Sequence, residues 1–526
     1  TADPQLIWPT ENEIAIELEK FYELKLNRQR NGDNFGYYEE FTEEGHKISM
    51  VGLPDLSNVR SMMLGIMNPE DNPNGKETIT AEIWFNELRL TDFTNRGGYA
   101  ARARAVAKMA DFATISVSGS YDGIGFGGID KRLNERNLEE LIQYDISSNF
   151  ELGKFFPQKY GVTIPMFVGW NEVFINPKFY PLNPDILMRT ALNNAETPQQ
   201  REEIREAAQD YTSRYSINFT NVRKNRTGGK KPHIWDIENF NLSYSYQNVY
   251  RRNQIIEENI IKTYRGSLGY NFSKNVRPWE PFKKKIKNKN LSLIRDFNLF
   301  FMPQSITARM DVDRHYAELQ NRNNDNFRAI VPRLYDKTFQ MTRFYGVNYN
   351  LTRSLKFNYT ANLNARVEEP FGALDTPEKL DTVRQNFWAF GLPNTFNQTL
   401  NGNYTLPFGR MKWLNWINSN VTYTGTYNWT TAPPAFSTLG NTIQNSMTLG
   451  FNTTFSFASL YSRIPAVRKA LAPPSKTNFK KSAEEEDDKE EEKKGPGPGA
   501  RNLVKMLTMI KNIQFNINQT DGTTLP

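Results

Sequence analysis

The sequence predicts an all-β fold: a partial, very large antiparallel transmembrane β-barrel, preceded by a small soluble β-sandwich (jelly-roll-like) piece and interrupted by one helical loop insert. Two observations predict it. Apolar and polar residues alternate along many long segments, and no run of about 18 apolar residues could cross a bilayer as a helix. A barrel needs apolar residues only at alternate positions, so a hydrophobic content of 38% and a mean hydropathy of −0.65 are compatible with it.

The alternation is clearest from Thr442 to Phe457. One parity is apolar and the other polar, with Ile443, Met447, Leu449, Phe451, Phe455 and Phe457 against Gln444, Ser446, Thr448, Gly450, Asn452, Thr454 and Ser456. At about 3.3 Å per residue this segment predicts a strand of roughly 50 Å, whereas most strands have about five or six residues. Long strands with one apolar and one polar face are typical of outer-membrane barrels, which contact lipid on one side and a lumen on the other.

Residues 1–93 predict the soluble β-sandwich piece. Turn sequences such as Asn68-Pro69 separate short segments with strand character. The expected strands are Ile14–Leu18, Ile48–Leu53, Met62–Met67 and Ile79–Leu90.

Residues 94–526 predict the strands and loops of the transmembrane barrel, with about fifteen long strands. Bacterial single-chain barrels have even strand numbers and no free edge, so this count favours an open arc completed by strands from a longer parent chain. The chain is therefore expected to be an internal fragment. Expected strands include 99–107, 113–121, 144–152, 215–219, 240–246, 306–312, 345–351, 355–363, 421–430, 442–457 and 513–517.

Two inserts interrupt the β pattern. Residues 197–211 predict one helix in a long loop, because Thr197 can cap it, Pro198 suits its first turn and apolar residues recur at helical spacing. Residues 475–500 predict a disordered charged loop, since the run Glu484–Lys494 and the Gly-Pro repeat after it cannot bury a core.

The lengths of the connections also favour a barrel. Short links at 303–304 and 352–353 are expected to alternate with long ones at 314–338 and 365–394. Outer-membrane barrels have short periplasmic turns and longer outer loops, so the two long segments are expected to face outward.

No catalytic, metal or cofactor site is predicted, and the protein is not expected to be an enzyme. The absence of cysteine excludes zinc-thiolate sites, iron–sulfur clusters and thiol nucleophiles. The three histidines, His46, His233 and His315, fall in separate segments without metal-binding spacing.

Two motifs that could carry chemistry have plainer interpretations. Asp311 and Asp313 share the polar side of an expected strand with Arg309, where charge lining a lumen is the ordinary alternative to a carboxylate pair in catalysis. Gly123–Gly128 matches the GxGxxG pattern of dinucleotide sites. The strand before it carries Thr and Ser at alternate positions, however, while a nucleotide fold needs a strand buried on both faces.

The net charge of +7 comes with two basic clusters. Nucleic acid is not an expected partner, because no compact basic domain or supporting motif accompanies them. Lipid phosphate at a membrane interface and simply solvated loop charge are the two interpretations that remain open. The clusters are Arg223, Lys224, Arg226, Lys230 and Lys231, and Lys283, Lys284, Lys285, Lys287 and Lys289.

Several blocks of the sequence resemble the SprA/Sov family, the outer-membrane translocon of the type IX secretion system in Bacteroidetes. They are residues 81–93 (AEIWFNELRLTDF), 97–101 (GGYAA), 108–112 (KMADF), 152–157 (LGKFFP), 164–165, 219–224 and 368–372. The signature residues carried by these blocks are structural in character: Trp84, Phe85, Asn86, Glu87, Leu88, Arg89, Leu90, Gly97, Gly98, Asp111, Phe112 and Pro157.

The resemblance implies a protein-conducting channel in the cell outer membrane that passes folded cargo to the cell surface and serves gliding motility. It implies as partners secreted cargo proteins with C-terminal signals, a shuttle barrel, a plug protein and outer-membrane lipid, and it implies no cofactor. Two alternatives remain: an ordinary outer-membrane porin or TonB-dependent transporter, and a soluble β-rich surface adhesin.

Overall fold

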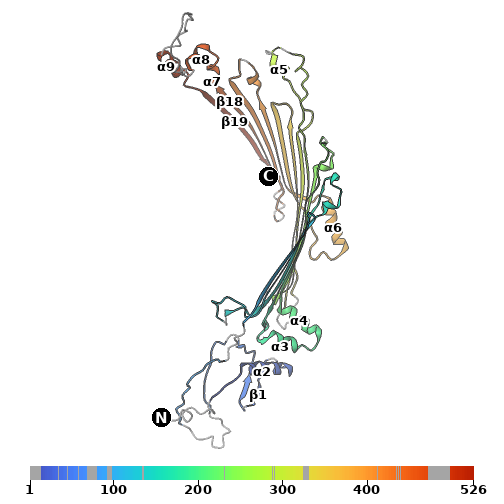
Figure 1. Ribbon diagram of the computed structural model, residues 1–526, viewed down its shortest axis with the longest axis vertical. Coiled ribbons are helices and arrows are strands. Elements are labelled where there is room, and N and C mark those ends of the chain that lie inside the picture. The colour runs from blue at the N-terminus through green and yellow to red at the C-terminus, as the bar shows by residue number, and fades with distance from the viewer. Residues whose placement is uncertain are drawn as a thin grey trace, which may run out of the picture.

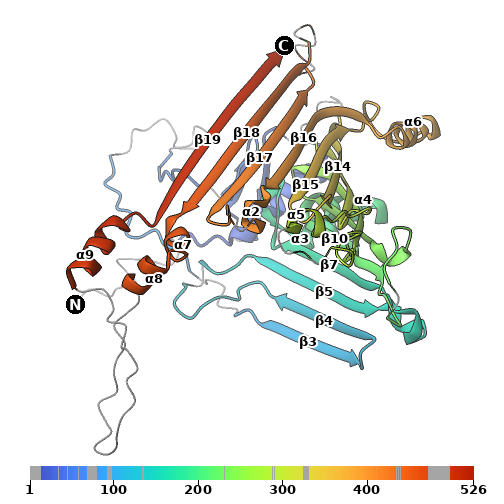
Figure 2. The same ribbon diagram turned by 90° about the horizontal axis from the view of Figure 1, so that it is seen from above.

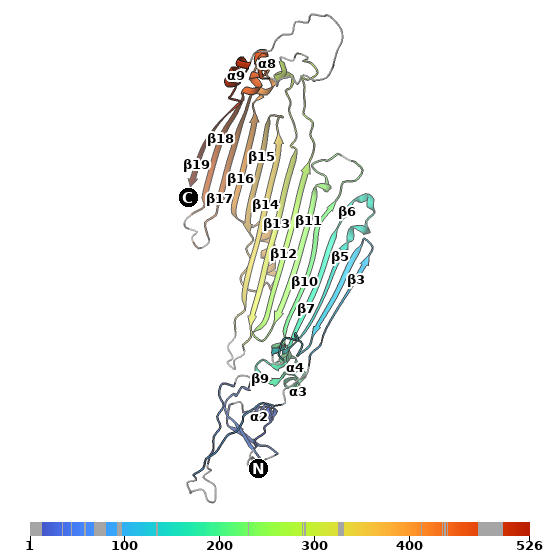
Figure 3. The same cartoon turned by 60° about the vertical axis from the view of Figure 1, so that its left-hand side comes forward.

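The computed structural model describes most of the chain. The described residues are 13–525 without 34, 44, 57–58, 68–79, 92–96, 133–134, 230, 287, 289–290, 324–330, 412, 434, 436–437, 439 and 472–497. They form one large antiparallel sheet and a small N-terminal unit, which lies beside the loop helix α3 in Figures 1 and 3.

The N-terminal unit (residues 18–56) contains the helix α2 (Leu18–Arg30) and the hairpin of β1 (Tyr38–Phe41) and β2 (Lys47–Met50). Leu24 of α2 packs with Ile48 and Met50 of β2 in a small core. Arg28 is buried in the same unit and donates to the carbonyl oxygens of Gly36 and Gly52, at 3.0 and 2.7 Å.

This unit corrects the predicted β-sandwich. In place of the strand expected at Ile14–Leu18, a helix begins at Leu18, because apolar residues recur at helical spacing through Phe21 and Leu24. Described residues 59–67 and 80–91 are exposed and form no strand, and none of them pairs with a described strand. Of the four expected strands, only the one at Ile48–Leu53 forms, and it is shorter, as β2.

The main sheet contains 15 strands, which agrees with the predicted number, although the two-residue β6 is one of them. All of its pairs are antiparallel, and each long strand pairs with the next long strand along the chain. Its members are β3 (Ala100–Met109), β4 (Ala113–Asp122), β5 (Glu139–Glu151), β6 (Val162–Thr163), β7 (Pro165–Pro177), β10 (Asp210–Lys224), β11 (Phe240–Arg252), β12 (Ile256–Ser273), β13 (Ser305–Asn321), β14 (Leu334–Asn350), β15 (Leu355–Arg366), β16 (Leu392–Thr405), β17 (Ile417–Thr430), β18 (Thr442–Ser456) and β19 (Asn512–Leu525).

The sheet is open and curved. Among the described strands, β3 and β19 are its edges and do not pair with each other. Figure 2 shows the sheet bending into an arc between these edges, with the helix α6 (Pro377–Trp388) on its convex side.

The connections contain a second hairpin and several helices. The predicted insert 197–211 is confirmed as α4 (Pro198–Ala208), whose first turn is capped by the Thr197 hydroxyl, which accepts from the Gln200 N–H; Tyr211 belongs to β10 instead. The charged loop 475–500 lies outside the described residues, except that α9 begins at Pro498. The other elements are β8 (Phe179–Tyr180), β9 (Asn183–Leu187), α3 (Met188–Asn193), α5 (Ser292–Arg295), α7 (Phe457–Tyr461), α8 (Pro465–Leu471) and α9 (Pro498–Leu507).

None of the described helices is both long enough and apolar enough to cross a membrane.

Because the strands alternate in direction, their connections fall at two ends of the sheet. The end that we call the first end has the connections 110–112, 152–164, 225–239, 274–304, 351–354, 406–416 and 457–511. The end that we call the second end has the connections 123–138, 178–209, 253–255, 322–333, 367–391 and 431–441. The expected short link at 352–353 and the long connection at 365–394 are confirmed as 351–354 and 367–391, but both ends have short and long connections, so the alternation does not hold. The expected short link at 303–304 is the last part of the long connection 274–304.

Candidate functional surface: a sheet with two different faces

The strand register gathers the predicted apolar positions on one face of the sheet. Residues directly opposite each other on neighbouring strands point to the same face. Val421 lies opposite Phe451, and Phe451 lies opposite Ile517. At the other edge Val117 lies opposite Ile146 in the same way. The apolar face therefore extends from β3 to β19, across strands far apart in the sequence.

The opposite face is polar, and neutral hydrogen bonds link its strands near the C-terminal edge. The Thr424 hydroxyl donates to the Asn401 side chain at 3.1 Å, and the hydroxyls of Thr448 and Thr520 are 3.1 Å apart. These groups remain partly accessible to water, so the hydrogen bonds hold the strands in register without removing the polarity of the face.

Charged residues occupy the middle of this polar face. Arg265 contacts Asp313 at 3.1 Å, and Arg309 contacts Asp311 at 2.7 Å. The Ser267 hydroxyl also donates to Asp311. The two carboxylates singled out in the sequence are thus each paired with an arginine on the polar face, an arrangement suited to a charged, hydrated wall.

Aromatic rings gather on the apolar face near both ends of the strands. At the first end, the ring centroids of Phe112 and Phe155 are 5.0 Å apart, and that of Trp416 is 5.8 Å from the centroid of Phe455. At the second end the rings of Phe174, Tyr211 and Tyr250 form a continuous row, with centroid distances of 4.8 and 5.9 Å.

The helix α6 packs on the apolar face at the second end. Its residues Val383 and Phe387 contact Phe339 and Met341 of β14, and the Met341 side chain is 0% exposed. The rings of Phe387 and Phe339 stack with centroids 5.9 Å apart. Because α6 lies on the convex side of the arc in Figure 2, the apolar face is the convex one and the polar face is concave.

The N-terminal unit is joined to the second end by a buried ion pair that the sequence analysis did not identify. Lys25 Nζ lies 2.9 Å from Asp185 Oδ2, and the two side chains are only 4% and 2% exposed. Asp185 Oδ1 accepts from the Leu56 N–H, and Lys25 also donates to the Pro54 carbonyl. The residues are 160 positions apart, so no local sequence signal could have paired them.

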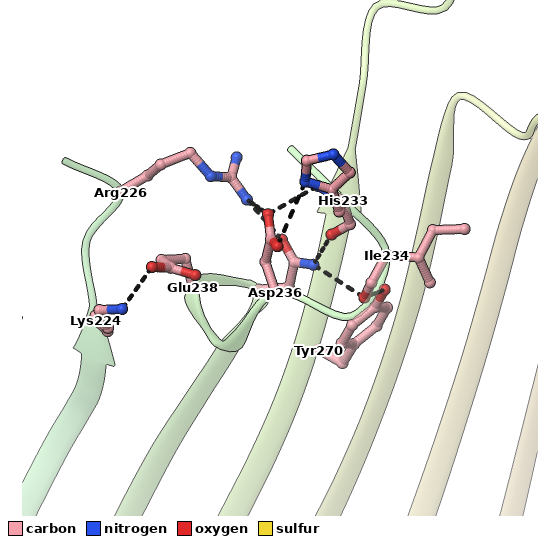
Figure 4. Close-up of polar contacts among 8 residues, drawn as sticks. Lys224, Arg226, His233, Ile234, Asp236, Glu238 and Tyr270 are labelled. Atoms are coloured by element: carbon pink, nitrogen blue, oxygen red, sulfur yellow. Dashed lines mark hydrogen bonds and ion pairs between the residues drawn. The ribbon is translucent and has the colours of Figure 1, made fainter. Parts of the chain in front are cut away.

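At the first end, a polar network closes the connection 225–239 (Figure 4). Asp236 accepts from the His233 N–H at 2.7 Å and from Arg226 at 3.2 Å. Its pKa is lowered chiefly by the backbone hydrogen bond from His233 and further by the positive charge of Arg226. The pKa of Glu238 is lowered likewise by its hydrogen bond with Lys224.

The signature residues of the 81–93 block lie in an exposed extended segment. Trp84 is 74% exposed, and its indole N–H donates to Glu82 at 2.8 Å. Arg89 and Glu87 form a loose surface contact at 3.8 Å. Phe85, Asn86, Leu88 and Leu90 are exposed as well.

The remaining signature residues meet the sheet at two places. Gly98 packs on the backbone of the glycine-rich loop, where a Cβ atom would approach Phe126 N to 2.1 Å. Gly97 beside it has open space. At the first end Asp111 pairs with Lys154 and Phe112 packs on Phe155, close to the turn that Pro157 begins. The GxGxxG pattern thus forms a packed loop against Gly98.

The three histidines lie apart, as their sequence positions predict. His46 follows a turn in the N-terminal unit, His233 is in the network of Figure 4, and His315 is on β13. Within the described residues, no group of three or more His, Asp or Glu side chains could hold a metal ion.

Comparison with known proteins bears on the signature blocks. Residues 1–192 match the family model SprA_N, described as a motility related/secretion protein. This range contains every signature residue and both members of the Lys25–Asp185 pair. No curated protein matches the chain. The N-terminal part of the chain is therefore similar to this family of motility-related and secretion proteins, and the match supports the resemblance to the SprA/Sov family.

Proposed function

We propose that this chain forms part of the wall of a protein-conducting channel in the cell outer membrane. One observation carries the proposal: a continuous sheet with an apolar convex face and a polar concave face. Large exposed apolar surfaces on soluble proteins are rare and mark sites of interaction with partners or membranes. Against hydrocarbon the convex face needs no further cover, and the concave face lines water.

Strand dimensions support this placement. A strand needs about 9–11 residues to cross the hydrocarbon of a bilayer when it is tilted. The long strands have from 10 residues in β3 to 18 in β12. Aromatic rings near both ends of the apolar face correspond to the aromatic girdles of outer-membrane barrels, which lie at the two membrane interfaces.

The open edges support a wide pore. An unpaired strand edge presents free N–H and C=O groups, which cost several kcal/mol each inside a bilayer. Further strands pairing with β3 and β19 would satisfy these groups and enlarge the barrel. Very wide barrels enclose an aqueous interior.

The family description as a motility-related and secretion protein favours folded protein as the cargo. The proposed partners are secreted proteins with C-terminal signals, a shuttle barrel and a plug. In this role the chain needs no catalytic residue and no cofactor. The Asn, Thr and Ser side chains of the concave face would offer passing proteins weak, reversible contacts.

Conductance tests the proposal. We expect the complete protein, freed of any plug and placed in planar bilayers, to show a conductance far above that of ordinary porins. Conductance limited to small solutes would contradict a protein-conducting channel and favour the porin alternative. A full-length protein that stays soluble without detergent would favour the adhesin.

A further inference from the structure

The first end of the sheet carries a basic surface in three neighbouring connections: 152–164, 225–239 and 274–304. These connections are bonded to one another. The Asn225 N–H donates to the Gly161 carbonyl at 2.7 Å, which joins the first two. The Tyr270 hydroxyl donates to the Ile234 carbonyl at 2.6 Å, which joins the second to the end of β12, where the third begins. Figure 4 shows this second junction.

Every carboxylate in these three connections already has a cationic partner. The sequence places four there, Asp236, Glu238, Glu280 and Asp296. Each forms an ion pair of 2.7–3.2 Å, and the pairs are Arg226–Asp236, Lys224–Glu238, Lys283–Glu280 and Arg295–Asp296. Glu280 also contacts Arg353 at 2.8 Å. No acidic side chain of these connections is left to balance further cations.

Six cations of the same connections remain uncompensated, and we call them the basic rim. Within the part of the chain that the structure describes, none of them forms an ion pair with a carboxylate. They are Lys159, Lys231, Lys274, Arg277, Lys284 and Lys285. All are exposed except Lys274, which is partly exposed.

The second end has a different balance of acidic and basic residues. Its connection 178–209 contains several glutamates among its arginines, and 367–391 has more acidic than basic residues. Charge that served only to keep loops hydrated would not need an excess of one sign at one end. The one-sided excess of cations therefore points to an anionic surface next to the first end.

Exposed aromatic residues accompany the basic rim. Trp235 is 77% exposed and stacks on His233, and Trp279 is 52% exposed and lies 5.8 Å from Phe301, between ring centroids. Tryptophan is favoured at the level of lipid headgroups, where its ring meets both apolar and polar surroundings. Lysine and arginine beside it reach the phosphates of the same layer.

We propose that the basic rim binds the phosphate groups of anionic lipid headgroups in the membrane leaflet next to the first end. This inference rests on the membrane placement under the proposed function. It adds a difference between the two membrane leaflets: the first end contacts anionic lipid in its leaflet, and the second end does not. Attraction between exposed cations and a lipid surface falls with rising ionic strength, because salt screens it within about 10 Å at 0.1 M.

Electron spin resonance with spin-labelled lipids tests the inference. The complete protein is reconstituted in phosphatidylcholine bilayers that contain a trace of spin-labelled phosphatidylglycerol or spin-labelled phosphatidylcholine, and the motionally restricted fraction of each label is measured. We expect preference for phosphatidylglycerol, and the variant Lys284→Gln/Lys285→Gln should lower that preference by about threefold or more at low salt. The matched control, Lys131→Gln/Arg132→Gln, removes two exposed cations from the second end and should leave the preference unchanged.

Each outcome decides a separate point. Equal restriction of both lipids by the unaltered chain, or an equal loss in the rim variant and the control, would overturn the basic rim as the site. Competition by inorganic phosphate at millimolar concentration would show a free-anion site instead of a lipid surface and would also overturn it. Failure of the unaltered complete protein to restrict either label would contradict membrane insertion, and with it the proposed function.

Discussion

At the scale of single residues, two glycines next to each other in the sequence have different roles. A side chain at Gly98 would collide with the backbone at Phe126, while one at Gly97 would meet nothing within 4 Å. Backbone atoms cannot rotate away as a flexible side chain can, so the loop that packs on Gly98 would have to move.

We therefore expect Gly98→Ala to destabilise the packing of the glycine-rich loop by about 1–3 kcal/mol, the usual cost of overpacking. Gly97→Ala is the matched control and should change stability by less than about 0.5 kcal/mol. Hydrogen exchange of residues 123–128 measures the effect, and equal protection in the two variants would contradict it.

The buried Lys25–Asp185 ion pair leads to a second prediction at the scale of single residues. Removal of one partner from a buried ion pair leaves an uncompensated charge and costs about 3–5 kcal/mol. We expect Lys25→Met to release the N-terminal unit from the second end. The exposed pair of Lys47 and Glu39 provides the control, since Lys47→Met removes a surface contact worth about 0–1 kcal/mol.

Proteolysis and hydrogen exchange of residues 18–56 would reveal this release. If the Lys25→Met and Lys47→Met variants show the same protection, the buried pair does not hold the unit in place. A loss of protection that also spreads through the main sheet would show that the attached N-terminal unit stabilises the main sheet as well.

At the scale of elements, period-two alternation predicted the strands of the main sheet well. It gave no information about the helices in the connections between them. The segment 442–456 became β18 because it pairs along its length with β17, where Phe451 lies opposite Val421 and Leu449 opposite Tyr423. Phe457 begins the helix α7 instead. The equally alternating segment 80–90 formed no strand, since no partner strand lies beside it among the described residues. Alternation is a property of one segment, whereas strand formation also depends on a neighbouring strand, which can be distant in the sequence.

The helix α6 shows the same limit for helices. Thr376 caps it and Pro377 begins it, as Thr197 and Pro198 do for α4, so the same local signal was available within the segment expected to be a long loop. Its docking on Phe339 and Met341 could not be foreseen, because the contact joins a loop to a strand face that folding creates.

Truncation of a fully buried aromatic ring costs about 3–5 kcal/mol, and truncation of the partly buried Phe387 ring should cost a part of that. We expect Phe387→Ala to detach α6 from the convex face, because its ring stacks on Phe339. Leu380→Ala is the control in the same helix and should have little effect, because Leu380 lies nearer the start of the helix and is 48% exposed. Hydrogen exchange of residues 377–388 distinguishes them, and unchanged protection in Phe387→Ala would contradict the packing role.

At the scale of the whole molecule, the identity of the two faces decides between a membrane wall and a soluble sheet. The number of strands and their apolar parity could be predicted from the sequence, because both follow from local alternation. The assignment of convex and concave faces could not, since curvature and the position of α6 depend on the assembled sheet.

Substitutions at two adjacent residues of β18 test this assignment. The two residues lie at nearly the same depth in the proposed membrane, so only the face differs between them. Met447 belongs to the apolar face and lies opposite Gly425, whereas Ser446 belongs to the polar face and lies opposite Thr426. Arginine facing lipid at the bilayer midplane costs about 2–4 kcal/mol, and arginine facing a lumen stays hydrated. We expect Met447→Arg to lower the free energy of unfolding in lipid vesicles by about that amount, and Ser446→Arg to change it by less than about 1 kcal/mol.

Denaturant titration of the complete protein in phosphatidylcholine vesicles measures both variants. A soluble sheet would give a different pattern, because arginine at either exposed position would remain in water and the two variants would have equal stability. The reverse order, with Ser446→Arg the more damaging, would place the polar face against the apolar phase. Only a larger loss in Met447→Arg agrees with a convex face in contact with hydrocarbon, and the same comparison can be repeated along β17 and β19 to find where the apolar band ends.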